Sequence, residues 1–450
     1  VGVGVGVGVG VALSNETTPP MSAQQRGFLL QFAPHLRTLV DASPLPFDPQ
    51  YRSPCWRERG GKELLCMPYL YLAGMPKCST STLFVEISNS HPLIAPNCDG
   101  FRHKEPQWWT RNTDNRSLPS YLKRSFGTRC DGRGQDGDSP LTRINASPGT
   151  VFVDGSVQLL WEPKLHGTEE HRLLAPDVLR VIQPTARVLV VLRDPTDRLW
   201  SEFTWFSKRQ ARNEATAAET FRRRVDAGLA LLERCHCLPG ASGAQGAGAH
   251  LCTPETITGV YRGAATGPGC ERALQNDMAN PPGSRVWIGL YIVYLNEWLS
   301  VFPRQQIMVL EMRFLHSNLA LALAQIHVFM GLPPVPSGGG SGGGGAGGFG
   351  GQGTTMPKFV PVSSSTARMD PKTNEVLRRF YGPFNRALAE ATGNDVFRWE
   401  VAVAESSGGT SHQHEHRGHG STAASSALVG AGPNAMTGLA HRAQRPPRTR

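Results

Sequence analysis

The chain has 450 residues with 50 Gly and 35 Pro, and its 46 Lys and Arg residues outnumber its 36 Asp and Glu residues, for a net charge of +10. This length suits one large domain or two ordinary ones, and the composition excludes collagen, a coiled coil and a wholly disordered chain. The positive charge favours an anionic partner such as a nucleotide, a nucleic acid, an acidic glycan or a membrane surface.

The nine cysteines contain no CxxC pair, which argues against a zinc ribbon. Four of them are candidates for one or two disulfides near a Gly-rich insertion, with the pairing left open: Cys235, Cys237, Cys252 and Cys270. Asn-x-Ser/Thr sequons at Asn15, Asn115 and Asn145 favour a secretory location, although such sequons also arise by chance.

The first residue is Val1, and a Val-Gly repeat follows it, so we expect a chain whose N-terminus, with any signal anchor, is missing. The most apolar stretch is Val286–Phe302. It contains Asn296 and Glu297 and therefore predicts a buried helix rather than a membrane span.

Regular structure is predicted from residue 68 onward, after a low-complexity N-terminus and an irregular lead-in over residues 1–67. The first elements are a strand over 68–73, a turn over 74–76 and a helix that begins at Thr80. A surface loop over 131–149 then leads to a strand over 151–153 that ends at Asp154.

The clearest strand is 187–192, a continuous apolar run of the kind that is buried in a parallel sheet. The later predicted elements are helices over about 197–210, 286–302, 318–331 and 371–392 and a strand over 307–310. The alternation of strands and helices predicts an α/β fold with a central, mostly parallel sheet flanked by helices. We expect one domain over 68–400, interrupted by insertions at about 238–285 and 337–353, and a disordered tail over 401–450.

The turn after the first strand predicts an anion site. A loop that leaves a strand and opens a helix exposes backbone N–H groups at the positive end of the helix dipole, and Lys77 adds a full charge there. Cys78 separates Lys77 from the hydroxyl residues at 79–82, so the loop is not a Walker A loop and a magnesium-dependent NTPase is the weaker interpretation. The alternative to an anion site is a capped helix whose lysine has no role in ligand binding.

A second anion site is predicted at the end of the 187–192 strand, where open α/β sheets place ligands. Arg193 follows that strand directly, and Ser201 lies two turns into the next helix. Arg198, between them, is expected to be structural. Two anion sites at the ends of two parallel strands suit a nucleotide with phosphates at both ends.

These residues resemble motifs of the carbohydrate sulfotransferase family, most closely the N-acetylgalactosamine 4-sulfate 6-O-sulfotransferase group. The similar segments, in order, are Pro76–Leu83, Lys104–Trp109, Leu192–Ser201, Gly289–Tyr291 with Trp298–Pro303, and Phe380–Asn385. The resemblance covers roughly residues 68–400 without the Gly-rich insertions. It implies a P-loop-like sulfotransferase fold and the donor 3′-phosphoadenosine 5′-phosphosulfate.

By position, the resemblance assigns Lys77 to the 5′-phosphosulfate and to charge stabilisation on the leaving oxygen, and Glu105 to general-base catalysis. The loop residues Cys78, Ser79, Thr80, Ser81 and Thr82 would hold the 5′-phosphate, and Arg193 and Ser201 the 3′-phosphate. Lys358 and Arg368 are candidates for a basic residue over the nucleotide. The family usually has Gly at position 79, so Ser79 would be strained if that position requires a positive φ.

Glu105 has two possible roles. It could form an exposed ion pair with Lys104, or it could be a base in a cleft whose wall Trp108 and Trp109 provide for stacking sugar rings. The segment Asp154–Ser156 is a further candidate on the acceptor or nucleotide side. The His-rich tail around His412–His416 reads as solvated low-complexity sequence, and no metal is expected.

The resemblance therefore implies a sulfotransferase that acts on a hydroxyl of a neutral or acidic glycan in the Golgi lumen. We expect no nucleic-acid partner, and membrane attachment only through an N-terminal anchor missing from this chain. The alternatives are a nucleotide-dependent kinase and a catalytically inactive glycan-binding relative.

Overall fold

The computed structural model describes residues 45–57, 63–95, 97–98, 104–110, 117–127, 140–161, 164–167, 172–206, 214–236, 284–334 and 369–399, together with Gly27. All of these belong to one compact unit, Val1–Glu400. The second unit, Val401–Arg450, lies outside the described residues, as do the predicted insertion at 337–353 and most of the insertion at 238–285.

A five-stranded sheet lies at the centre of this unit, in the order β4-β5-β3-β8-β9. Its strands are β3 (Leu70–Gly74), β4 (Ile94–Ala95), β5 (Val151–Asp154), β8 (Arg187–Leu192) and β9 (Ile307–Glu311). Every neighbouring pair is parallel, and the first four strands are buried nearly throughout. The predicted α/β fold with a central parallel sheet is confirmed.

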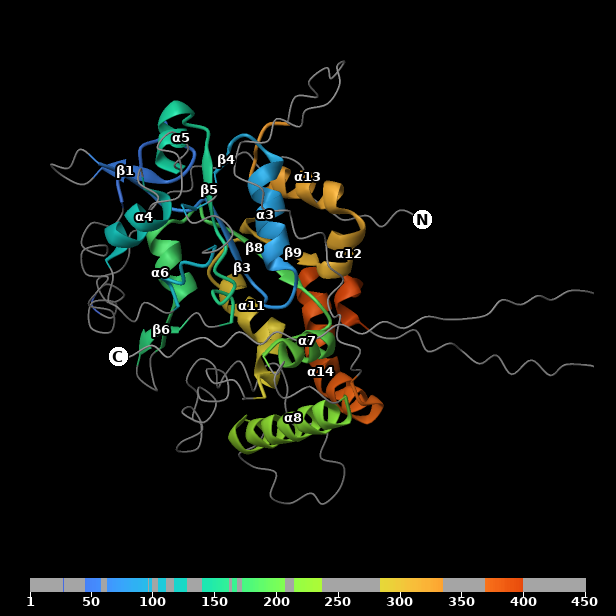
Figure 1. Ribbon diagram of the computed structural model, residues 1–450. Coiled ribbons are helices and arrows are strands. Elements are labelled where there is room, and N and C mark those ends of the chain that lie inside the picture. The colour runs from blue at the N-terminus through green and yellow to red at the C-terminus, as the bar shows by residue number, and fades with distance from the viewer. Residues whose placement is uncertain are drawn as a thin grey trace, which may run out of the picture. The chain divides into compact units, whose positions relative to one another are not determined.

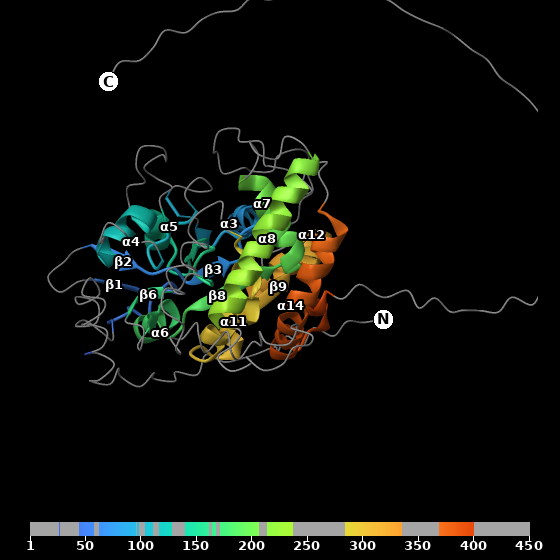
Figure 2. The ribbon, with the colours of Figure 1, turned by 90° about the horizontal axis from the view of Figure 1, so that it is seen from below.

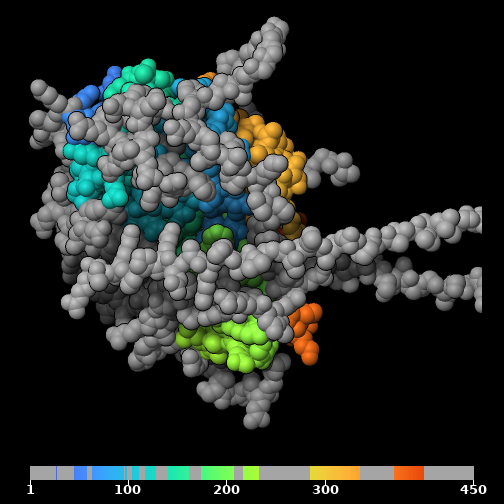
Figure 3. Space-filling model, viewed as in Figure 1, coloured from blue at the N-terminus to red at the C-terminus, as the bar shows by residue number. Residues whose placement is uncertain are grey.

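Helices cover both faces of the sheet. In Figures 1 and 2, α3 (Thr80–Ser90) lies on one face, and α6 (Ala175–Ile182) and α11 (Tyr291–Leu299) lie on the other. Helix α13 (Leu319–Phe329) packs beside α3, and the two are adjacent in the space-filling view (Figure 3). The remaining α-helices are α4 (Leu118–Phe126), α5 (Pro140–Ala146), α7 (Pro195–Phe206), α8 (Glu214–His236), α12 (Met312–Ser317) and α14 (Pro371–Thr392).

Two predicted elements need correction. Helix α5 occupies Pro140–Ala146, within the stretch predicted as a loop; its apolar Leu141 and Ile144 are buried and hold it against the core. The predicted helix over 286–302 is a 3₁₀ turn, Val286–Gly289, followed by α11. Among the described helices, none combines the length and the apolar character that a membrane crossing requires.

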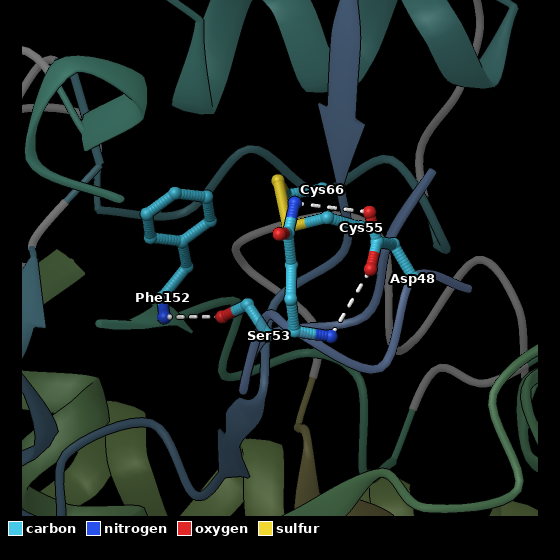
Figure 4. Close-up of a disulfide and its surroundings, with 6 residues drawn as sticks. Asp48, Ser53, Cys55, Cys66 and Phe152 are labelled. Carbon is cyan, nitrogen blue, oxygen red and sulfur yellow. Dashed lines mark hydrogen bonds between the residues drawn. A yellow bond between two sulfur atoms is a disulfide. The ribbon is translucent and has the colours of Figure 1, made fainter. Parts of the chain in front are cut away.

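The lead-in to residue 68 also contains regular structure that was not predicted. Strands β1 (Cys55–Arg57) and β2 (Leu64–Cys66) form an antiparallel pair, and a Cys55–Cys66 disulfide joins them (Figure 4). The Ser53 hydroxyl accepts a hydrogen bond from the backbone N–H of Phe152, in β5, at 3.1 Å. The hairpin is therefore attached to the β5 side of the central sheet.

Loss of this disulfide should destabilise the protein. We expect the double variant Cys55→Ser/Cys66→Ser to lose about 2–4 kcal/mol of unfolding free energy, because the open chain regains loop entropy. Urea unfolding followed by circular dichroism measures the difference. The wild type under reductant should lose at least as much, because Cys98 is disulfide-bonded too. A double variant as stable as the oxidised wild type would contradict the prediction.

Candidate active site

The carboxyl ends of four parallel strands gather at one edge of the sheet and carry the predicted site residues. Tyr71 of β3 pairs with Asp154, the last residue of β5, and Leu192 of β8 pairs with Glu311, the last residue of β9. The segments that follow β3, β5, β8 and β9 therefore start at the same edge, where open α/β sheets bind ligands.

The loop between β3 and α3 has the geometry of an anion cradle. It is tied to β8 by a hydrogen bond from the Met75 N–H to the Val191 carbonyl, at 2.9 Å. The Leu83 N–H donates to the Ser79 carbonyl at 3.0 Å, which is the first hydrogen bond of helix α3. The N–H groups of residues 80–82 therefore lie in the first turn, where the helix offers them no carbonyl partner. Such N–H groups, at the positive end of the helix dipole, favour an anion.

Cys78 contributes to this loop through its backbone. Its side chain is fully buried, and the thiol donates to the Pro76 carbonyl with an Sγ–O distance of 3.8 Å. Burial raises the pKa of the Cys78 thiol to about 12, against the lowering influence of Arg198 and Arg193. The thiol is therefore protonated at neutral pH and is not a nucleophile.

Ser79 has the left-handed backbone conformation that the comparison with glycine suggested, with φ of 60° and ψ of 20°. Its hydroxyl makes no cap hydrogen bond to α3 and instead lies 2.8 Å from Nε2 of His316, in α12. Partial burial lowers the pKa of the His316 imidazole, and Arg193 lowers it further, although Glu311 opposes them. The neutral imidazole can thus form a hydrogen bond with the Ser79 hydroxyl, and this bond connects the β3–α3 loop to the segment after β9.

The strain at Ser79 and its bond to His316 should nearly offset each other in stability. A left-handed non-glycine residue costs about 1–2 kcal/mol, and a hydrogen bond contributes about 0.5–1.5 kcal/mol. We expect the unfolding free energy of Ser79→Gly to lie within about 0.5 kcal/mol of the wild-type value. The substitution removes both the backbone strain and the hydrogen bond, and it also increases the entropy of the unfolded chain. His316→Ala removes the bond alone and should lose about 1 kcal/mol. Thermal unfolding at pH 7.5 compares them, and equal losses would contradict this account.

The predicted second anion site, at the end of β8, contains buried polar atoms that have no hydrogen-bond partner. The Arg193 side chain is mostly buried; its Nη2 lies 3.8 Å from the Asp197 carboxylate, while its Nη1 is buried without a hydrogen-bond partner. The Ser201 hydroxyl, on α7, is also buried without a partner. Buried polar groups are rarely left unsatisfied. A guanidinium nitrogen and a hydroxyl in this state fit an anionic ligand.

Arg198 is structural, as predicted. Its side chain is fully buried and forms an ion pair with Glu202 at 2.7 Å, and the other oxygen of Glu202 lies 3.3 Å from Arg285. Nη2 of Arg198 also donates to the Arg285 carbonyl at 3.2 Å. This buried network fixes α7, and with it Ser201, against the segment that precedes α11.

Two other predicted motifs support Arg193 rather than contribute ligands. The Tyr291 hydroxyl, on α11, donates to the Arg193 carbonyl at 3.0 Å. The Tyr381 hydroxyl, on α14, donates to the Val286 carbonyl at 2.7 Å, and its ring lies so close to Gly289 that a Cβ there would be 2.7 Å away. The Gly289–Pro303 and Phe380–Asn385 segments thus pack together behind the β8 end of the site.

Glu105 lies at the carboxyl end of β5. The Gly155 N–H donates to the Lys104 carbonyl at 3.0 Å, and the Gln107 N–H donates to the Ser156 hydroxyl at 3.0 Å. Lys104 is buried and forms an ion pair with the partly exposed Glu105 at 2.5 Å. Burial lowers the pKa of Lys104, although Glu105 opposes this shift. The pair is therefore not the exposed surface pair of the alternative interpretation.

The two tryptophans beside Glu105 do not form a wall for sugars, and that expectation is wrong. Trp108 and Trp109 are buried, and Trp108 stacks on Tyr121 with ring centroids 5.5 Å apart. Asp154 is also buried, where it accepts a 2.6 Å hydrogen bond from the Tyr121 hydroxyl. Burial raises the pKa of the Asp154 carboxyl. These groups form the core beneath the site.

An aromatic neighbour of Lys77 was not predicted. The Lys77 ammonium lies 4.1 Å from the ring centroid of Trp205, in the last turn of α7. Trp205 lies four residues after Ser201, so helical periodicity could have placed both near one ligand. The sequence signal was available, but with aromatic residues at 203, 205 and 206 the sequence does not show which ring is exposed.

Several predicted residues lie outside the described parts of the chain. These are Lys358, Arg368, Cys237, Cys252, Cys270, Asn15, Asn115 and the His-rich tail. Asn145 is described and exposed, near the end of α5.

Comparison with known proteins identifies sulfotransferases as similar to this chain. Residues 163–337 match the sequence model of the Sulfotransferase domain, a range that includes Arg193 and Ser201 and begins after Lys77 and Glu105. Carbohydrate sulfotransferase 15 is 26% identical over 358 residues in Rattus norvegicus and 26% over 363 residues in Homo sapiens. The chain is similar to carbohydrate sulfotransferases.

These alignments cover 75% of this chain and 55% of the length of carbohydrate sulfotransferase 15, so the chain spans about half of those relatives. The crystal structure of a sulfotransferase from Alicyclobacillus acidocaldarius is also similar, with 18% sequence identity and a TM-score of 0.40 over 74% of this chain and 100% of that one.

Proposed function

We propose that this protein is a carbohydrate sulfotransferase that transfers a sulfuryl group from 3′-phosphoadenosine 5′-phosphosulfate to a glycan hydroxyl. The observation that carries the proposal is the pair of buried, unpartnered polar atoms at the end of β8, Nη1 of Arg193 and Oγ of Ser201. Beside them, at the same edge of the sheet, lies the Lys77 loop, so two anion sites serve one ligand.

The donor has phosphate groups at both ends, and each of the two sites would bind one of them. The N–H groups of Thr80, Ser81 and Thr82 would hold the 5′-phosphate at the start of α3. Arg193 and Ser201 would hold the 3′-phosphate. Residues Lys358 and Arg368 remain candidates for an additional contact over the nucleotide.

In the proposed reaction the acceptor oxygen forms a bond to sulfur while the bond between sulfur and the bridging oxygen of the donor breaks. The Glu105 carboxylate takes the proton of the acceptor hydroxyl. The Lys77 ammonium stabilises the negative charge that develops on the bridging oxygen as adenosine 3′,5′-bisphosphate leaves. Lys104 keeps the Glu105 carboxylate oriented through their 2.5 Å ion pair.

The acceptor and the cellular setting are also parts of the proposal. The likeness to the N-acetylgalactosamine 4-sulfate 6-O-sulfotransferase group makes sulfated galactosaminoglycans the first acceptors to test. The Cys55–Cys66 disulfide fits an oxidising compartment such as the Golgi lumen. Attachment to its membrane would require an N-terminal anchor.

The test is transfer of radiolabelled sulfate from the donor to chondroitin, dermatan and heparan sulfates and to their desulfated forms. We expect labelled glycan with at least one acceptor and competition by adenosine 3′,5′-bisphosphate. Magnesium-dependent phosphate transfer from ATP in a parallel reaction would instead support a kinase. Glycan binding with neither reaction would support an inactive glycan-binding relative.

A further inference from the structure

We propose that Trp205 is a platform on which a sugar ring of the acceptor stacks, and this inference rests on the proposed sulfotransferase function. Trp205 and Phe206 end α7 and are 55% and 52% exposed, which makes them unusual among the large apolar side chains of the described residues. An exposed indole offers a flat apolar face, and sugar rings present apolar C–H faces that pack on such rings.

The position of the indole relates it to the reacting group. The Lys77 ammonium lies 4.1 Å from the Trp205 ring centroid, a distance at which a cation interacts with the ring face. Lys77 is the residue assigned to the leaving oxygen. A sugar held on the remaining exposed surface of the indole would therefore be kept beside the group where sulfur–oxygen bond exchange takes place.

The segment that follows β5 connects this platform with Glu105. Its first residues, Gly155 and Ser156, form hydrogen bonds with the Lys104–Gln107 segment. Its last residue is Trp161, and the Arg285 Cζ lies 5.5 Å from the centroid of the Trp161 ring. Arg285 also lies 5.7 Å from the ring centroid of Phe206. One short segment thus supports the proposed base at one end and the aromatic end of α7 at the other.

Charge fits the same kind of ligand. Lys77 lies against the exposed ring of Trp205, and the chain as a whole carries a net charge of +10. An exposed aromatic ring beside a cation suits a sugar that carries sulfate or carboxylate groups. The occupant of the Trp205 surface is accordingly an acidic sugar of the acceptor chain.

Steady-state kinetics of Trp205→Ala and Trp205→Phe test the proposal with the best acceptor of the wild type. We expect Trp205→Ala to raise the acceptor KM about tenfold, with a smaller change in kcat, and Trp205→Phe to restore most of the affinity. The matched control is Val328→Ala, on α13, which removes apolar surface from a side chain that is 59% exposed. The control should leave both constants unchanged.

A loss of kcat with an unchanged acceptor KM would overturn the proposal, because it would mean that Trp205 acts only by positioning Lys77. Binding of fluorescein-labelled chondroitin sulfate, measured by anisotropy with adenosine 3′,5′-bisphosphate present, gives a readout that needs no turnover. If the wild type binds this probe without transferring sulfate, the proposed sulfotransferase function fails, but the comparison of wild type and Trp205→Ala still tests whether Trp205 binds the sugar. Equal binding of the probe by the wild type and Trp205→Ala would overturn the proposal that Trp205 is a sugar platform.

Discussion

Lys77→Ala should reduce kcat for sulfate transfer by about 10²–10³-fold, because it removes the charge that we propose to stabilise the leaving oxygen. Donor binding should weaken far less, since the α3 N–H groups, Arg193 and Ser201 remain. Initial rates with radiolabelled donor measure the first effect, and calorimetric titration with adenosine 3′,5′-bisphosphate measures the second. Thermal unfolding should be nearly unchanged, because Lys77 is a partly exposed loop residue.

The matched control for Lys77→Ala is Lys372→Ala, which removes an exposed ammonium at the start of α14. Its kcat should equal that of the wild type. A loss smaller than tenfold in Lys77→Ala would refute the role of Lys77 at the leaving oxygen and would leave it as a donor-binding residue only.

Glu105→Gln should abolish most turnover, by about 10²–10⁴-fold, and leave donor affinity almost intact. The change keeps the shape of the side chain but removes its ability to take a proton. It also removes the carboxylate that opposes the downward shift of the Lys104 pKa, so the buried amine should lose its proton more easily. The measurements are initial rates and calorimetric titration with adenosine 3′,5′-bisphosphate.

A second variant separates catalysis from folding. Glu105→Asp keeps the negative charge beside Lys104 and draws the carboxylate back by one methylene. We expect it to unfold near the wild-type temperature and still to lose most of its kcat, because a general base must reach the acceptor hydroxyl at hydrogen-bond distance. Parallel losses of donor affinity and turnover in both variants would show that Glu105 holds the donor instead.

The parts of the fold that could be predicted are those in which a local pattern is sufficient. The continuous apolar run Arg187–Leu192 gave strand β8 with its observed bounds, because only a buried strand suits such a short run next to Arg193 and Pro195. Helix α14 also has its predicted bounds. Asp370 caps its start by accepting from the Thr373 N–H, and Gly393 ends it with φ of 64°.

The parts that could not be predicted depend on contacts between distant segments. Strands of three residues, such as β1 and β2, show no periodicity, and the positions of nine cysteines in the sequence do not reveal that Cys55 pairs with Cys66. The exposure of a tryptophan depends in the same way on what the rest of the chain packs against it. The sequence therefore predicts exposed rings for Trp108 and Trp109, which are buried, and does not single out Trp205, whose ring is exposed.

The buried thiol of Cys78 makes the β3–α3 loop observable without any substrate. Cys78 is a free cysteine, and both its burial and its raised pKa protect it from alkylating reagents in the folded protein. Its alkylation should require transient opening of the loop, so that the modification rate, followed by peptide mass spectrometry, reports the free energy of that local opening. A nucleotide bound in the loop should slow the reaction in proportion to its occupancy.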